Sequence, residues 1–350
     1  MSRTQDFVDY VAKYNQDLAG TTEAFFQREK LEASLIDSSL EHIIDDYKDF
    51  LNGGKKLRGV LIKFCYEIYG GRDASLALST SLIIEIIHSF FLIHDDIMDQ
   101  DEVRRNSPTM HVKYSREFGN HFGIAKAIDQ GDVGMFLAYK ALFGLDIPFA
   151  VKDRLGRILN QILLEVGYGQ MLDVTYEQQE KFTEEDVLRV HRYKTAEYTI
   201  SGPLSIGAIL AGAPKSKLKA LKDFGIPVGI AFQIKDDELG MFSTEEELGK
   251  PVDSDLKEGK VTLLIVKALE KAKGADRKFL RHAHGNDKLT LKEVERVRDI
   301  MKKCGALGYS QRKSRELVEE GKKFIPQITR DPKYQKLLSQ LADFVIERKS

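Results

Sequence analysis

The sequence has few of the residues that favour loops and cross-links. Only eight prolines and two cysteines occur among its 350 residues. The cysteines, Cys65 and Cys304, lie in segments with helical periodicity, so structural thiols are expected and not a disulfide framework. Strand signals are nearly absent, whereas long stretches space their apolar residues as a helix does. These absences favour an all-α protein.

The sequence also lacks an excess of charge of one sign. Its net charge is −1, and acidic and basic residues are interspersed, so no general attraction for nucleic acid or an anionic membrane is expected. The charged N-terminus does not resemble a signal peptide, and no uninterrupted apolar run approaches the about 20 residues of a membrane span. We therefore expect a cytoplasmic protein without a membrane span.

One short phrase occurs twice. Residues 91–96 read FLIHDD and residues 232–237 read FQIKDD, so each apolar lead-in ends in two adjacent aspartates. The first phrase lies in Ser79 to Asp99, a segment without Pro or Gly that is apolar on most of its circumference, which predicts a buried helix. On this helix Asp95 and Asp99 share a face, and Asp96 lies beside them.

Several carboxylates brought together need a positive partner. A pair about 4 Å apart repels by roughly 4 kcal/mol at an effective dielectric near 20. Oxygen ligands without a Cys or His cluster suit Mg²⁺, which also takes water and substrate phosphate as ligands. A single Asp-Asp pair is more simply a helix end in solvent, but two matching pairs favour a metal site for a phosphorylated ligand.

Three basic clusters could bind the anion. They are Gly53 to Arg58, with a glycine turn before Lys55 and Arg58, then the pair Arg104 and Arg105, and the group Lys250, Lys257 and Lys260. A loop that enters a helix presents both backbone N–H groups and side chains to a phosphate. Each cluster alone is best explained as surface charge, whereas their combination with the aspartates predicts a site for a phosphorylated ligand.

With these motifs the chain resembles the trans-isoprenyl diphosphate synthases of the polyprenyl synthetase family, from about Gly53 to Lys260. The family's first aspartate motif is Asp95 to Asp99, followed by Arg104 and Arg105. Its second is Gln233 to Gly240, and Gly53 to Arg58 resembles its isopentenyl diphosphate loop. Gly169-Gln170 with Asp173, and Tyr193-Lys194-Thr195, stand between them in the family's order. One departure is Gly240, where many members have a third aspartate.

The resemblance implies a fold and a reaction. The fold is an all-α, single-domain helical bundle of the isoprenoid synthase type over residues 1–350, with a central cavity, in a homodimer. The reaction is head-to-tail 1'-4 condensation of an allylic diphosphate with isopentenyl diphosphate to give farnesyl or geranylgeranyl diphosphate. More than one Mg²⁺ ion would be held by Asp95, Asp99 and Asp236, with Asp96 and Asp237 in support.

The resemblance also implies roles for the other residues. The allylic diphosphate would be contacted by Arg104, Lys194 and Lys250, and more distantly by Lys260. Thr195 and Gln233 would place oxygen dipoles near the allylic cation. The isopentenyl diphosphate would be held by Gly54, Lys55, Arg58, His88 and Arg105. A lone histidine on an apolar helix is usually a core residue, but His88 lies two turns before Asp95 on its face, which favours a binding role.

Two aromatic residues bear on the length of the product. Phe90 and Phe91 lie one turn before Asp95, about 6 to 7.5 Å along a helix axis, where the growing hydrocarbon chain would meet them. Paired aromatics there resemble farnesyl diphosphate synthases, although Leu239-Gly240 resembles the geranylgeranyl type, and both rings could simply pack against neighbouring helices. We expect a C15 product, with C20 as the next choice.

Two other kinds of protein share parts of this pattern. A class I terpene cyclase has the first aspartate motif and an all-α scaffold but no second diphosphate site. A non-catalytic partner subunit of a prenyl synthase would have lost metal ligands, which this chain retains. At the C-terminus, Arg348 and Lys349 are most simply a frayed basic tail, with closure over the isopentenyl site as the alternative.

Overall fold

The computed structural model describes residues 4–179, 181–244, 246 and 252–348. Helices make up nearly all of its regular structure, and the strands in this described part are β1 (Val103–Arg104) and β2 (Ser107–Pro108), which pair as an antiparallel hairpin. The chain divides into two compact units, described separately below. The all-α expectation is confirmed, and a single domain over residues 1–350 stays a prediction.

The N-terminal unit comprises Gln5–Ile158 and Pro203–Ala213. Its elements are α1 (Gln5–Ser34), η1 (Ser38–Leu40), α2 (Glu41–Asn52), α3 (Leu57–Ile68), α4 (Ala74–Met98), the β1–β2 hairpin, α5 (Met110–Phe118), α6 (Asn120–Phe143), the start of α7 (Phe149–Glu177) and most of α9 (Gly202–Leu210). Helix α4 is central, because it contacts α1, α2, α3, α5 and α6. The Tyr47 hydroxyl ties α2 to it by donating to the Ile86 carbonyl at 2.7 Å.

Helix α4 begins one turn earlier than the sequence pattern predicts, because the carboxylate of Asp73 caps it by accepting the Leu76 N–H at 3.0 Å. It also has the length and mean hydropathy of a membrane-spanning helix, contrary to the expectation that no such run exists. Its most apolar window is 67% buried inside the fold, however. A helix that is apolar nearly all round and buried by its neighbours is a core helix.

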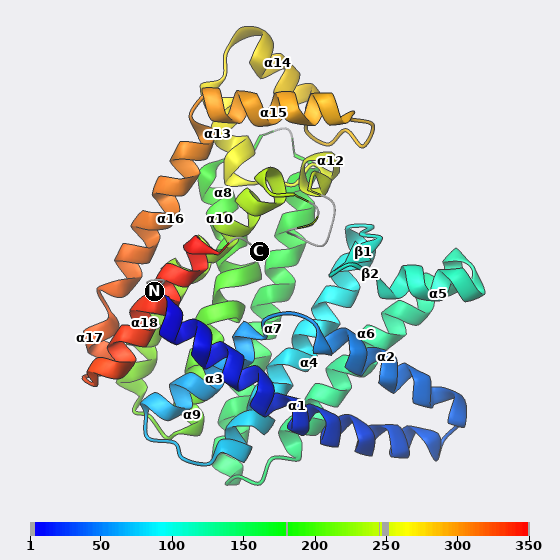
Figure 1. Ribbon diagram of the computed structural model, residues 1–350, viewed down its shortest axis with the longest axis vertical. Helices are drawn as coiled ribbons and strands as arrows, with labels where there is room; N and C mark the ends of the chain where they lie inside the picture. The colour runs from blue at the N-terminus through cyan, green and yellow to red at the C-terminus, as the bar shows by residue number, and fades with distance from the viewer. Residues whose placement is uncertain (1–3, 180, 245, 247–251, 349–350) are drawn as a thin grey trace. The chain divides into compact units, whose positions relative to one another are not determined.

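The C-terminal unit comprises Leu159–Gly202 and Pro214–Ser350, with Met1–Thr4. Its elements are the rest of α7, α8 (Glu184–Val190), the π-helix η2 (His191–Ser201), α10 (Lys215–Phe242), α12 (Ser254–Glu258), α13 (Leu263–Lys271), α14 (Gly274–Ala283), α15 (Leu291–Lys303), α16 (Ala306–Lys322), α17 (Ile325–Ile328) and α18 (Pro332–Glu347). Helix α10 contacts η2, α16 and α18 (Figure 1).

Glycines allow η2 to lie directly on α10. A Cβ atom at Gly225 would lie 2.7 Å from the Cα of Ser201, and one at Gly229 would lie 2.6 Å from the Cα of Ala196. Since the two glycines are four residues apart, they form one smooth stripe on the face of α10. This stripe brings the backbone of η2 close to α10 at the turn before the second aspartate motif.

Candidate active site

The first aspartate motif lies at the C-terminal end of α4. Asp95 is in the last turn, and Asp99 follows the helix as its C-cap, donating its N–H to the Asp95 carbonyl at 2.8 Å. Both side chains are partly exposed, whereas Asp96 is only 1% exposed. Helical geometry therefore places Asp95 and Asp99 on one accessible face and turns Asp96 toward the protein.

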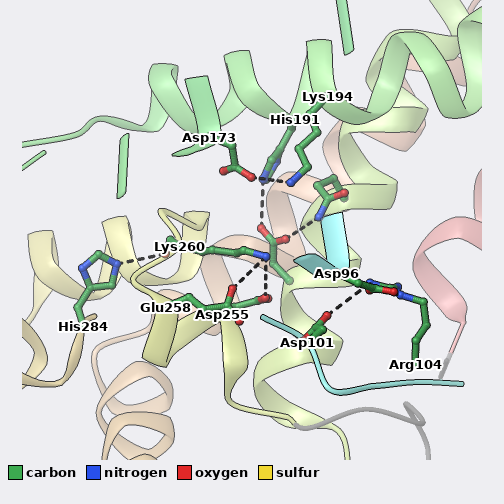
Figure 2. A network of polar contacts seen from close by, with 12 residues as sticks. Asp96, Asp101, Arg104, Asp173, His191, Lys194, Asp255, Glu258, Lys260 and His284 are labelled. Atoms are coloured by element: carbon green, nitrogen blue, oxygen red, sulfur yellow. Dashed lines mark hydrogen bonds and ion pairs between the residues drawn. The ribbon is translucent and has the colours of Figure 1, made fainter. Parts of the chain in front are cut away.

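Arg104 is held by two carboxylates in the structure (Figure 2). Its Nε donates to Asp96 Oδ1 at 2.5 Å, and its Nη2 lies 3.4 Å from Oδ2 of the buried Asp101. Burial raises the pKa of Asp96 to about 6, although the guanidinium acts to lower it. Arg104 thus pairs with the buried aspartate of the first motif. The sequence pattern did not single out Asp101.

The second arginine of the pair lies on the glycine loop. A Cβ atom at Gly53 would lie 2.6 Å from Arg105 Nη1, and one at Gly54 would lie 2.7 Å from Nη2. Gly54 also has a φ of +82°, a conformation that side chains disfavour. Arg105 donates to the Phe50 carbonyl at 3.1 Å. Gly54 is therefore favoured by its backbone conformation, and both glycines leave room for the approach of this guanidinium.

His88 faces a cation and not an apolar core. Its Nε2 lies 3.1 Å from Arg58 Nη1. Burial, together with the nearby charges of Arg58, Arg105 and Arg104, holds the pKa of His88 well below its usual range, so the ring is neutral at physiological pH. The structure therefore gathers Arg58, His88 and Arg105 beside Gly54, as expected for one anion site, and Lys55 lies exposed in the same loop.

A buried carboxylate lies among these cations. Glu85 is 4% exposed and accepts the Gly59 N–H at 2.7 Å. Burial raises the pKa of Glu85, while that N–H group and the charges of Arg58, Lys56 and Arg105 act in the opposite direction. Sequence reasoning missed Glu85, although a single acid within the run LIIEII is a usable signal because an isolated charge in a core helix needs a partner.

The second aspartate motif lies near the end of α10. The side chain of Asp236 is 51% exposed, whereas Asp237 is 7% exposed. Asp237 Oδ1 accepts from Gln233 Nε2 at 2.9 Å, and Gln233 Oε1 accepts from the Thr195 hydroxyl at 2.7 Å. The predicted residues Thr195, Gln233 and Asp237 therefore form one hydrogen-bonded chain between η2 and α10.

Asp237 has a second neighbour that the sequence pattern did not reveal. Nε2 of the buried His191 lies 3.1 Å from Asp237 Oδ2 (Figure 2). Burial raises the pKa of Asp237, although His191 and Gln233 act to lower it. His191 begins η2, three residues before Lys194, so its position depends on the π-helical turn.

The predicted lysines have acidic partners in the C-terminal unit. Lys194 Nζ donates to Asp173 Oδ2 at 2.7 Å (Figure 2). A Cβ atom at Gly169 would overlap the backbone of Lys194, which explains how α7 and η2 approach so closely there. Lys260 Nζ lies 3.2 Å from Glu258 and 3.7 Å from Asp255. Lys250 lies outside the described residues.

The interpretation of the C-terminus as a frayed tail is wrong for Arg348. Its guanidinium donates to Asp236 Oδ1 at 2.8 Å and to the Phe232 carbonyl at 3.1 Å, and its Cζ lies 3.9 Å from the centre of the Phe232 ring. Its side chain is 9% exposed. Arg348 therefore neutralises the exposed aspartate of the second motif, and Lys349 lies outside the described residues.

The donor atoms suit a hard divalent cation. Asp95, Asp99 and Asp236 offer carboxylate oxygens, and no donor reaches the buried Asp96 Oδ2 within the described residues. In that same part of the chain no three His, Cys, Asp or Glu side chains gather into a metal site of their own. Mg²⁺ usually takes one or two carboxylates and completes its octahedron with water and substrate phosphate. These residues fit that mode of binding.

A sequence model described as polyprenyl synthetase matches residues 38–301. The chain belongs to the polyprenyl synthetase family. It is 36% identical over 323 residues to a short chain isoprenyl diphosphate synthase of Methanothermobacter thermautotrophicus, covering 91% of this chain and 94% of that protein. It is also 36% identical over 308 residues to a geranylgeranyl diphosphate synthase of Sulfolobus acidocaldarius, covering 87% and 89%.

A solved structure agrees with this membership. The geranylgeranyl pyrophosphate synthase of Corynebacterium glutamicum, complexed with isoprenyl diphosphate and magnesium, matches with a TM-score of 0.89 and 27% identity, over 97% of this chain and 98% of that one. The family resemblance and the all-α isoprenoid synthase fold are thus confirmed. The roles of individual site residues stay predictions.

Proposed function

We propose that this member of the polyprenyl synthetase family is a short-chain trans-prenyltransferase. It condenses an allylic diphosphate with isopentenyl diphosphate, head to tail, to give farnesyl or geranylgeranyl diphosphate. The observation that carries the proposal is the cluster of Arg58, His88 and Arg105 on the Gly54 loop, in addition to two aspartate motifs. A class I terpene cyclase has no use for that second anion site, and a non-catalytic subunit has no use for retained metal ligands.

The aspartate motifs would bind the allylic diphosphate through divalent cations. Asp95 and Asp99 would hold them from α4 and Asp236 from α10, and the chemistry of the donors favours Mg²⁺, with more than one ion. A bound cation neutralises the negative charge that develops on the departing diphosphate. Lys194, oriented by Asp173, would contact the same diphosphate.

The remaining residues would position the second substrate and protect the reacting carbon. Arg58 and Arg105 offer planar guanidinium groups that match diphosphate oxygens, and neutral His88 orients Arg58 by accepting from its Nη1 at 3.1 Å. The hydroxyl of Thr195 is directed to Gln233 Oε1, so it is restrained from attacking the allylic cation. These groups supply dipoles near the cation without a competing nucleophile.

Pyrophosphate release tests the proposal. The full-length protein should release pyrophosphate only when Mg²⁺, an allylic diphosphate and isopentenyl diphosphate are all present. Asp95→Ala should lower the rate by orders of magnitude while the thermal unfolding midpoint stays close to that of the wild type. Release from the allylic diphosphate alone would indicate a cyclase, and no release under any combination would indicate a non-catalytic subunit.

The product length is proposed from Phe91. It lies one turn before Asp95 on the same face of α4, whereas the Phe90 ring is 4.8 Å from the ring of His94, which in turn contacts the Ile128 carbonyl of α6. The Phe90 ring therefore packs against rings of its own helix, that of His94 and, at 4.7 Å, that of Phe91. We propose that Phe91 limits the chain to C15 or C20.

A homodimer is proposed from the exposed face of α6. Phe122, Phe136 and Phe143 are 62%, 71% and 66% exposed, and they are separated by multiples of seven residues, so they line one face of the helix. Three exposed aromatic side chains on one helix face are typical of a protein interface. Sedimentation should give a dimer for the wild type and a monomer for Phe136→Glu.

We also propose a cytoplasmic location. The charges of the chain are interspersed, and its most apolar helix is buried in the core of its unit. Fractionation of cells that express the full chain should leave it in the high-speed supernatant, and recovery in the membrane pellet would contradict this proposal.

A further inference from the structure

Left-handed backbone conformations gather in the segment that carries the arginine pair. Within the described residues, the non-glycine residues with a positive φ are Lys56, Gln100, Arg105 and Asn106. Three of these four lie between α4 and α5, on or next to the β1–β2 hairpin. Side chains disfavour this conformation because Cβ crowds the following carbonyl oxygen. Such strain persists only where the surrounding structure enforces it, and it is concentrated at binding and active sites.

The hairpin joins its strands through a tight turn. Arg104 pairs with Ser107, so Arg105 and Asn106 form the turn, and their φ values are +53° and +60°. Positive φ at both central residues is typical of a type I′ turn, whose twist matches that of the two strands. Asparagine is one of the few residues with a side chain that tolerate this conformation, whereas arginine is not. Asn106 therefore favours the turn, and Arg105 is held in a conformation that it disfavours.

The turn directs the two arginines to different places. Arg104 lies in β1, its side chain is 16% exposed, and it pairs with the buried carboxylates of Asp96 and Asp101 (Figure 2). Arg105 lies in the turn and donates to the Phe50 carbonyl at 3.1 Å, with its guanidinium 5.9 Å from the centre of the Phe50 ring. A change in the backbone of the turn would therefore displace Arg105, while Arg104 stays with its carboxylates.

The base of the hairpin is fixed by contacts outside the turn. Thr109 is 0% exposed, and its hydroxyl donates to the Asp101 carbonyl at 2.8 Å. The Thr109 N–H donates to the Glu102 carbonyl at 3.1 Å, and the Asp101 N–H donates to the Asp96 carbonyl at 3.0 Å. With the base held in this way, the conformation of the turn decides where Arg105 lies.

We propose that Asn106 is a positioning residue for the second diphosphate. Its tolerance of the left-handed conformation holds the turn in the form that places Arg105 beside Gly53 and Gly54. Asn106 is exposed, so its replacement removes no core packing and acts through the backbone of the turn. This inference rests on the proposed function, because it concerns the guanidinium that would bind isopentenyl diphosphate.

The test is the steady-state kinetics of the full-length protein, with each substrate varied while the other is saturating. Asn106→Val places a β-branched side chain at a positive φ, so KM for isopentenyl diphosphate should rise about 5- to 30-fold. KM for the allylic diphosphate should stay within about twofold of the wild type, because Arg104 keeps its partners. Asn106→Gly should keep the wild-type KM for isopentenyl diphosphate, since glycine adopts a positive φ freely.

Ser107→Val is the matched control. Ser107 is the exposed neighbour in β2, where a β-branched side chain suits the extended backbone, so this variant should keep the wild-type kinetics. A double-mutant cycle shows whether Asn106 acts through the arginine. In an Arg105→Ala background, Asn106→Val should cause no further rise in KM for isopentenyl diphosphate. Asn106→Ala also disfavours the left-handed conformation, and it serves if the valine variant unfolds.

Four results would overturn the inference. These are a wild-type KM for isopentenyl diphosphate in Asn106→Val, an equal rise in KM for the allylic diphosphate, an equal rise in Ser107→Val or Asn106→Gly, and a further rise of the same size in the Arg105→Ala background. Any of them in a protein whose wild type converts both substrates would refute this inference alone. A wild-type protein that neither binds isopentenyl diphosphate in calorimetry nor converts it would refute the proposed function as well.

Discussion

Gly54→Ala tests whether the glycine loop positions Arg105 for the second substrate. At Gly54 the φ is +82°, and an added Cβ would lie 2.7 Å from Arg105 Nη2. The substitution therefore has two effects, namely backbone strain of about 1 kcal/mol and displacement of the guanidinium. A hydrogen bond to a charged group contributes about 1.5 to 3 kcal/mol, so kcat/KM for isopentenyl diphosphate should fall about 10- to 100-fold.

Gly70→Ala is the matched control for the backbone strain. Gly70 has a φ of +85°, and no atom lies within 4 Å of the position its Cβ would take. Both variants should therefore lose about 1 kcal/mol in the free energy of unfolding in urea. Only Gly54→Ala should lose kcat/KM in an assay that varies isopentenyl diphosphate at saturating allylic diphosphate. Equal kinetics in the two variants would refute the role assigned to Arg105.

Three further predictions follow. Phe91→Ala should lengthen the product by one or more C5 units while Phe90→Ala does not, as measured by mass spectrometry of the dephosphorylated alcohols; unchanged products in both variants would exclude Phe91 as the limit. Arg348→Ala removes the guanidinium that pairs with Asp236 and should raise the affinity of the protein for Mn²⁺ severalfold. An affinity below that of the wild type would show that Arg348 and the cation do not compete for Asp236. Asp96→Asn should reduce the loss of folding stability between pH 5 and pH 7.5, as measured by urea unfolding.

The sign of this shift follows from the raised pKa of Asp96. Burial raises it to about 6, above its value of about 4 in the unfolded chain, so the folded state binds the proton more tightly. The stability that the protonated Asp96 carboxyl adds to the folded state is therefore fully present below about pH 4, and it is lost as the pH rises through about 6. Asp96→Asn should remove that loss, as measured by urea unfolding at pH 5 and pH 7.5. A variant with the wild-type pH dependence would refute the assignment.

The sequence predicted the elements that bear the motifs because their signals are local. The apolar run before Asp95 predicts α4, which ends in the first motif. Capping boxes also form at Thr183–Asp186 and Thr290–Glu293, where residues three positions apart start α8 and α15. Each of these signals depends on residues within one or two turns of each other.

The parts that the sequence did not reveal depend on contacts between distant residues. The pair of Arg348 with Asp236 spans 112 positions, and the place of Arg105 beside Gly53 and Gly54 depends on how the β1–β2 hairpin lies against their loop. The π-helix η2 has no distinct propensity, since its residues would also form an α-helix, and its register is what brings His191 to Asp237. Such features arise from packing between helices.

The central claim is that the two aspartate motifs hold divalent cations against one diphosphate. The most direct measurement is a crystal structure of the full chain with Mg²⁺ and an unreactive thiolo analogue of an allylic diphosphate. The account predicts that Asp95 and Asp236 both ligate Mg²⁺ ions that bridge to the same diphosphate, with Arg348 withdrawn from Asp236. Mg²⁺ and diphosphate bound to Asp95 alone, with Asp236 still paired to Arg348, would contradict it.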